Sequence, residues 1–122
     1  MKHILLVEDD DAIAKLVRFK LEKNGFQVTR ATNGKEALNW LKENRPALVL
    51  LDVMMPEMDG IETLEHIKGD ETLRDIPVIM LSSKGQKTEI DRCLFLGAAD
   101  YIVKPFKPAE LVKRIRAVIG ET

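Results

Sequence analysis

The sequence contains little cysteine, few aromatic residues and no long apolar segment. Cys93 is the single cysteine among 122 residues, which excludes an internal disulfide and a cysteine-based zinc site. We expect Cys93 to be an ordinary half-buried helix residue in a reducing compartment. Only a short apolar run, Ile4–Val7, follows the first three residues, and it is far shorter than a signal-peptide core or a membrane span. These absences predict a soluble, cytoplasmic protein with no membrane insertion.

The chain also lacks an excess of charge of either sign. It has 19 lysines and arginines against 20 aspartates and glutamates, for a net charge of -1, so no overall field attracts nucleic acid or an anionic membrane. Direct nucleic acid binding is therefore not expected. Hydrophobic residues make up 45% and charged residues 32%, a globular balance without linker-like segments. The length predicts one domain over residues 1–122.

Short apolar runs alternate along the chain with segments whose apolar residues have helical spacing. This alternation predicts βαβ units, and hence an α/β fold with a doubly wound, five-stranded parallel sheet covered by helices on both faces. The strand order we expect is the flavodoxin-like order 2-1-3-4-5. The expected strands are Ile4–Val7, Phe26–Ala31, Ala47–Leu51, Val78–Leu81 and Tyr101–Val103, and the expected helices are Ala12–Asn24, Gly34–Asn44, Gly60–Lys68, Gln86–Leu96 and Pro108–Ile119.

Asp52 directly follows the apolar run Ala47–Leu51. A run so rich in branched aliphatic residues is typical of a strand buried on both faces, which places a carboxylate at the C-terminal end of that strand. Ligands bind at this edge of an open parallel sheet. Taken alone, Asp52 is better explained as a residue that caps a turn, so the residues that converge on it decide the interpretation.

In the order 2-1-3-4-5, the strand that leads into Glu8 and Asp9 lies beside the strand that leads into Asp52. Three carboxylates then share one crevice, and their repulsion is relieved by a cation or by protonation. Ligands that are all oxygen suit Mg²⁺ or Mn²⁺. We expect Asp9 and Asp52 to ligate the metal directly and Glu8 to act through water. Asp10 is expected to cap the first helix instead.

Two further polar residues follow expected strands directly: Ser82 follows the fourth, and Lys104 follows the fifth. A carboxylate, a metal, a hydroxyl and an ammonium together describe a site for a phosphoryl group, with Asp52 as the nucleophile and Lys104 offsetting charge on the transferred oxygens. Each residue has an ordinary alternative, because Ser82 or Ser83 suits a helix N-cap and Lys104 suits the surface. Their joint position at strand ends favours the functional interpretation.

Four segments carry these side chains: Leu6–Asp10, Leu51–Gly60, Met80–Ser83 and Gly97–Phe106. In these segments the chain resembles the receiver domain of response regulators, the phosphoacceptor module of bacterial two-component signalling. The resemblance covers essentially the whole chain, and the four segments together are very specific. It implies a switch rather than an enzyme that acts on external metabolites, although such a switch assists its own phosphorylation and dephosphorylation.

The resemblance also implies a donor and a metal site. The donor is a histidine kinase or a histidine phosphotransfer protein, which passes a phosphoryl group from phosphohistidine to Asp52. Mg²⁺ is then held by Asp9, by Asp52 and by the backbone carbonyl of Met54, and Glu8 completes the acidic pocket. The fold that the resemblance implies is the flavodoxin-like fold expected above.

A switch is implied by the same resemblance. Ser82 bonds a phosphoryl oxygen and moves inward, Tyr101 changes rotamer with it, and Lys104 pairs with the phosphoryl group. The peptide bond between Lys104 and Pro105 is implied to be cis, a form that proline permits. The switch controls a downstream output protein or a missing effector domain.

The responsive surface implied by the resemblance is formed by the fourth helix, the fifth strand and the fifth helix. Ile90 and Phe95 occupy positions that are usually polar in receivers that dimerise to bind DNA through an attached winged helix, and Ala99 stands where an acidic residue is common. This departure argues against a charge-paired dimer and for a partner that docks on an apolar patch. In the alternative, the helix partly covers Ile90 and Phe95 itself. Three charged residues of such a face remain: Asp100, Glu110 and Arg116.

Three functions of other classes compete with this interpretation. A flavodoxin-type FMN protein needs a phosphate-binding loop after the first strand, where this chain has acids that repel phosphate. An aspartate-nucleophile phosphohydrolase has a second acid two residues after the nucleophile, where this chain has Met54. A phosphorylation-silent scaffold predicts a broken site, yet every expected position is filled.

Overall fold

The computed structural model describes residues 2–54 and 58–120, and it has the α/β architecture that the sequence predicts. All five strands pair in parallel in the order β2-β1-β3-β4-β5. The strands are β1 (His3–Val7), β2 (Gln27–Ala31), β3 (Leu48–Asp52), β4 (Val78–Ser82) and β5 (Asp100–Val103), and the helices are α1 (Asp11–Lys23), α2 (Gly34–Leu41), α3 (Gly60–Gly69), α4 (Lys87–Phe95) and α5 (Pro108–Ile119).

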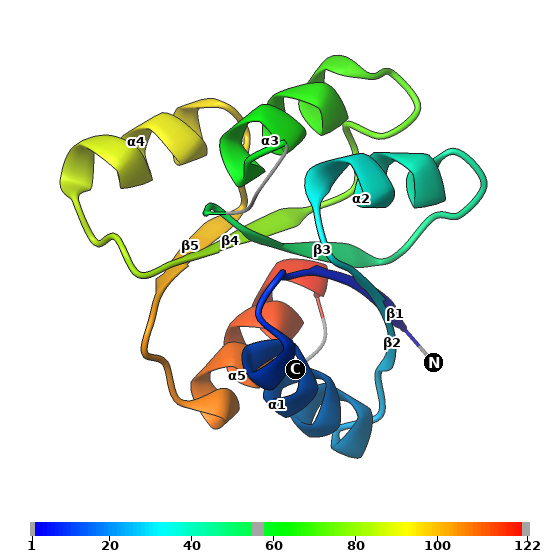
Figure 1. Cartoon of the computed structure of the whole chain (residues 1–122), viewed down its shortest axis with the longest axis vertical. Helices are drawn as coiled ribbons and strands as arrows, with labels where there is room; N and C mark the ends of the chain where they lie inside the picture. Colours follow the sequence, from blue (N-terminus) through cyan, green and yellow to red (C-terminus); the bar gives the residue numbers. More distant parts are fainter. Residues whose placement is uncertain (1, 55–57, 121–122) are drawn as a thin grey trace.

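The sheet separates two hydrophobic layers. Helices α2, α3 and α4 cover one face and α1 and α5 cover the other (Figure 1). Successive side chains of a strand point to opposite faces, so Val49 and Leu51 of β3 contact the first layer while Leu48 and Leu50 contact the second. All five residues of β3 are buried, Asp52 included. The continuous apolar run therefore does form a strand covered on both faces.

The helix ends follow the local signals closely, except at the end of α2. Gly25, at φ 90°, follows Asn24, which caps the end of α1; glycine suits this position because it adopts left-handed backbone at low cost. Helix α2 stops at Leu41, before the predicted end at Asn44.

Cys93 is fully buried rather than half-buried, since it lies on the one face of α4 that packs against the core. None of the described helices is long and apolar enough to span a membrane.

The strand register brings the chemically interesting residues to one edge of the sheet. Val7 pairs with Leu51, so the residues that follow β1 lie beside the end of β3. On the other side of β3, Asp52 pairs with Leu81 and so lies next to Ser82, the last residue of β4. Because the strands are parallel, all of these C-terminal ends meet at the same edge.

Candidate functional site

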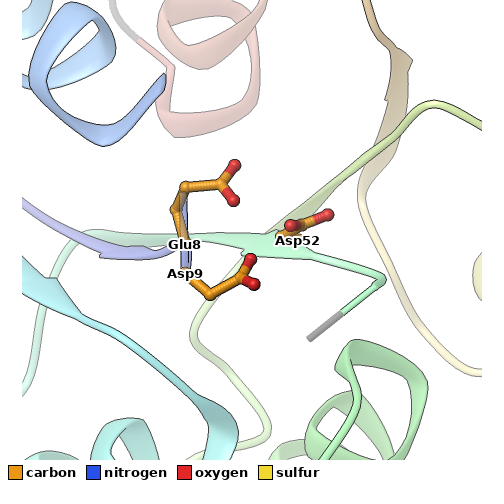
Figure 2. A group of neighbouring side chains, drawn as sticks. All are labelled: Glu8, Asp9 and Asp52. Carbon is orange, nitrogen blue, oxygen red and sulfur yellow. The ribbon is translucent and has the colours of Figure 1, made fainter. Parts of the chain in front are cut away.

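Three carboxylates meet where β1 and β3 end. Ligand oxygens of Glu8, Asp9 and Asp52 all lie within 4.8 Å of one another, and Figure 2 shows the three side chains extending into a common space. Glu8 is 0% exposed and Asp52 4%, whereas Asp9 is exposed. Such crowding of acids is unfavourable without a positive partner. The set offers oxygen ligands alone, and it therefore fits a hard cation such as Mg²⁺ in the manner expected from the sequence.

Lys104, which follows β5, supplies positive charge to this cluster. Its Nζ donates to Glu8 Oε1 at 2.9 Å and lies 3.5 Å from Asp52 Oδ1. The side chain of Lys104 is only 16% exposed, so it is not the surface lysine of the ordinary alternative. Its peptide bond to Pro105 is cis, as the resemblance implied. The ammonium is thus held between two carboxylates at the ends of different strands, since Glu8 follows β1 and Asp52 ends β3.

The pKa values of the cluster follow from burial and from these contacts. Burial, followed by the neighbouring Glu8, raises the pKa of Asp52 to about 7. Burial also acts to raise the pKa of Glu8, but the contacts with Asp52 and Lys104 outweigh it and the net shift is downward. Lys104 lies closer to Glu8 than to Asp52, so the ammonium favours the charged form of Glu8 more than that of Asp52.

Replacing Lys104 by methionine tests how strongly the ammonium supports the cluster. We expect the free energy of unfolding at pH 7.5 to fall by about 2 kcal/mol, because the buried carboxylates of Glu8 and Asp52 are left without their charged partner. At pH 5 the loss should be smaller, since Asp52, with a pKa near 7, is then already protonated. Urea unfolding followed by circular dichroism at both pH values measures this difference.

Lys107→Met is the matched control, because Lys107 is exposed and its side chain makes no cap hydrogen bond at the start of α5. The control should change the free energy of unfolding by less than about 0.5 kcal/mol. Equal losses in the two variants, or a Lys104→Met loss that does not depend on pH, would contradict the expected role of the ammonium.

Ser82 and Tyr101 both contact Lys84, in the loop between β4 and α4. Ser82 is the last residue of β4, is 0% exposed, and its Oγ accepts a hydrogen bond from Lys84 N at 3.0 Å. The Tyr101 hydroxyl donates to the Lys84 carbonyl at 2.8 Å. Gln86 is the N-cap of α4, so the alternative that Ser82 or Ser83 caps this helix is wrong. The loop after β4 is therefore tied to a hydroxyl beside Asp52 and to a buried tyrosine of β5.

The turn after β3 is ordered in part by Asp52 itself. The backbone N–H of Met54 donates to Asp52 Oδ1 at 3.3 Å, so Met54 lies beside the cluster. That its carbonyl ligates a metal stays a prediction. Met55, Pro56 and Glu57 of the same motif lie outside the described residues. After β1, Asp10 accepts a hydrogen bond from Ile13 N at 3.0 Å, so the predicted N-cap of α1 is confirmed.

The surface formed by α4, β5 and α5 combines an exposed apolar side chain with charged groups that bond within the chain. Phe95 is 90% exposed, while Ile90 is half-buried and packs against the core, so the expectation of a covered side chain holds for Ile90 alone. Asp100 accepts a hydrogen bond from Arg114 Nε at 2.8 Å, and Arg116 Nη2 donates to the Asn24 carbonyl at 3.1 Å. Two charged groups of this face are thus engaged within the chain.

One residue beside the cluster was not anticipated from the sequence. Arg30 of β2 donates from Nε to the Glu8 carbonyl at 3.0 Å and from Nη1 to Asp11 Oδ1 at 2.7 Å. The available signal was weak, since Arg30 is merely the one charged residue in the expected strand Phe26–Ala31. Its contact with Glu8 depends on the pairing of β1 with β2, which a local pattern does not specify.

Comparison with known proteins identifies the family. The response regulator receiver domain matches residues 4–116. The chain belongs to this family. It is 48% identical over 118 residues to the phosphate regulon transcriptional regulatory protein PhoB of Escherichia coli K12, covering 97% of this chain and 52% of PhoB. It is 42% identical over 119 residues to the transcriptional regulatory protein SrrA of Staphylococcus aureus NCTC 8325, covering 98% of this chain and 48% of SrrA. The receiver domain thus spans about half the length of these curated relatives.

Solved structures support the same assignment and bear on the metal. The receiver domain of a signal transduction histidine kinase from Syntrophus aciditrophicus matches with a TM-score of 0.91 and 38% identity, over 98% of this chain and 91% of that one. The receiver domain of the sensor histidine kinase PA1611 from Pseudomonas aeruginosa PAO1 matches with a TM-score of 0.90 and 32% identity, over 98% of each chain. The latter holds a magnesium ion coordinated in its active site cleft. Its fold and the acidic cluster here make Mg²⁺ the metal to test.

Proposed function

We propose that this receiver domain, over residues 1–122, is a phosphoacceptor switch that takes a phosphoryl group on Asp52 from a phosphohistidine donor in a Mg²⁺-dependent reaction. The observation that carries the proposal is the convergence of three carboxylates and the Lys104 ammonium at one sheet edge. The donor is a histidine kinase or a histidine phosphotransfer protein. The receiver domain itself is a switch that assists its own phosphorylation and dephosphorylation, and its chemistry is not directed at an external metabolite.

In this proposal Asp52 is the nucleophile. A carboxylate oxygen of Asp52 attacks the phosphorus, an oxygen–phosphorus bond forms, and the nitrogen–phosphorus bond to the donor imidazole breaks. The contacts of Asp52 with Lys104 Nζ and with Met54 N both fall on Oδ1. These contacts hold the carboxylate in one orientation, which leaves Oδ2 as the attacking atom.

The surrounding residues hold the transferred group and the metal. Asp9, Asp52 and the Met54 carbonyl would ligate Mg²⁺, or Mn²⁺ in its place, and Glu8 would act through water. When bound, the metal supplies positive charge that offsets the charge on the phosphoryl oxygens. Lys104 contributes a second positive charge beside Asp52, and the Ser82 hydroxyl offers a hydrogen bond to an oxygen of the phosphoryl group.

The same contacts suggest how phosphorylation reaches the surface. Ser82 Oγ accepts from Lys84 N, so a Ser82 hydroxyl that turns to bond a phosphoryl oxygen changes its contact with the loop. The Tyr101 hydroxyl donates a hydrogen bond to the Lys84 carbonyl of the same loop, so the tyrosine side chain moves with the loop. A local charge event then biases a two-state surface of α4, β5 and α5, to which a downstream output protein or an attached effector domain responds.

Intact mass after incubation with acetyl phosphate tests this proposal. We expect the wild-type chain to gain one phosphoryl group in the presence of Mg²⁺ and none when the metal is removed by a chelator. A gain without metal would contradict the proposed metal dependence. No gain despite measurable Mg²⁺ binding would show that the site is silent, and the alternative of a receiver-like interaction scaffold would replace the proposed function.

A further inference from the structure

Arg30 lies beside the acidic cluster but has no part in the reaction proposed above. From β2 it reaches the end of β1 and the start of α1, because Nε donates to the Glu8 carbonyl at 3.0 Å and Nη1 to Asp11 Oδ1 at 2.7 Å. The side chain is 22% exposed. The guanidinium thus connects the two ends of the short segment that carries Glu8 and Asp9.

The hydrogen bond to Glu8 extends the pairing of β1 with β2 beyond its last residue pair. That pairing ends with Val7 opposite Ala31, and Glu8 N still donates to the Ala31 carbonyl at 3.0 Å. For the next bond, the side chain of Arg30 takes the place of a backbone donor at the Glu8 carbonyl. This carbonyl belongs to the peptide that joins Glu8 to Asp9. Because a peptide group is planar, fixing its carbonyl fixes the direction in which Asp9 leaves the strand.

Fold stability offers a poor explanation for this arrangement. Asp11 is 93% exposed, and an ion pair with so exposed a partner contributes little. Among the described residues, Arg30 Nη2 is buried without a hydrogen-bond partner, which is unfavourable for a guanidinium group. The distinctive consequence of the side chain is therefore the position of the Glu8–Asp9 peptide.

We propose that Arg30 is a positioning residue for the metal site: it orients the Glu8–Asp9 peptide so that the Asp9 carboxylate faces Asp52. The inference rests on the proposed function, because it requires Mg²⁺ at this cluster. Loss of a group that orients a metal ligand typically weakens metal affinity 10- to 100-fold. The direction of the change in Mg²⁺ affinity is informative. Removing a nearby positive charge would by itself strengthen the binding of a cation, whereas loss of a positioning group weakens it.

Isothermal titration of the metal-free chain with Mg²⁺ tests the inference. Arg30→Met keeps the aliphatic stem and removes every donor, and we expect its affinity to be about tenfold weaker than that of the wild type. Asp11→Asn is the matched variant, because it removes the ion pair and leaves the hydrogen bond to the Glu8 carbonyl. Its affinity should change less than about threefold. If Arg30→Met does not fold, Arg30→Lys, which keeps the charge without the guanidinium geometry, is expected to show a loss of several-fold.

The outcomes separate this inference from the proposed function. Wild-type binding together with equal or tighter binding by Arg30→Met or Arg30→Lys would overturn the role of Arg30 alone. An equal loss in Asp11→Asn would overturn it too, since the ion pair would then be the active element. A wild-type chain that binds no Mg²⁺ would overturn the proposed metal site and this inference with it.

Discussion

Replacing Asp52 by asparagine is expected to abolish phosphoryl uptake while leaving the fold intact. Asparagine has nearly the same shape as aspartate, but its amide is not a nucleophile at neutral pH. Among the described residues, Asp52 combines a position at the end of the central strand with burial, at 4% exposed, and contact with Lys104. We therefore expect no other acidic residue to replace it as acceptor.

The same substitution should stabilise the metal-free domain at neutral and alkaline pH. The pKa of Asp52 is raised from 3.8 to about 7 in the folded chain, so the folded state holds a proton that the unfolded state releases. The associated stability is complete below pH 3.8 and is lost as the pH rises through about 7, where the folded chain must carry the buried charge. The substituted asparagine carries no such charge, and the advantage of Asp52→Asn over the wild type should grow between pH 5 and pH 8.

Two measurements check these results. Intact mass after exposure to acetyl phosphate and Mg²⁺ should show one added phosphoryl group in the wild type and none in Asp52→Asn. Asp91→Asn is the control, because Asp91 is an exposed residue of α4 whose side chain pairs with Lys87; it should take up the group normally. Urea unfolding at pH 5 and pH 8 follows the stability. Uptake by Asp52→Asn, or an equal effect on stability at both pH values, would contradict this account of Asp52.

The fold could be predicted from the sequence because its main signals are local. The buried strand β3 appears as an unbroken aliphatic run, and glycine and aspartate mark several helix ends, as Gly25 and Asp10 do. The differences arise where tertiary packing decides. The end of α2 at Leu41 and the complete burial of Cys93 depend on which side chains the sheet covers.

The candidate site could be predicted only as far as strand order determines it. Parallel strands in the order 2-1-3-4-5 bring Glu8, Asp9 and Asp52 together, whatever the details of packing. Strand order does not determine two other contacts near the site. Arg30 bonds the Glu8 carbonyl, and Tyr101 bonds the Lys84 carbonyl. Both use a backbone carbonyl as acceptor, and a carbonyl is present at every residue, so sequence patterns carry no information about them.

Gly60, the first residue of α3, is the position where we expect the largest loss of stability from a single methyl group. Its N–H donates to the Val53 carbonyl at 2.9 Å, so the helix begins in contact with the end of β3. A Cβ on Gly60 would lie 2.1 Å from the Asp52 carbonyl oxygen and 2.7 Å from Val53 Cα. These are backbone atoms of the last residue of β3 and of the residue after it. They cannot move without displacing Asp52.

Gly60→Ala should therefore lower the free energy of unfolding by about 4 kcal/mol, at the upper end of single-residue effects, and should slow phosphoryl uptake in the fraction that remains folded. Gly69→Ala, at the other end of α3, is the matched control, because a Cβ there meets nothing within 4 Å. Alanine is the better helix former, so the control should be neutral or more stable by up to about 1 kcal/mol. Urea unfolding compares the two variants. Similar free energies of unfolding for both would contradict the prediction, because they would show that the backbone of Asp52 and Val53 accommodates a Cβ on Gly60.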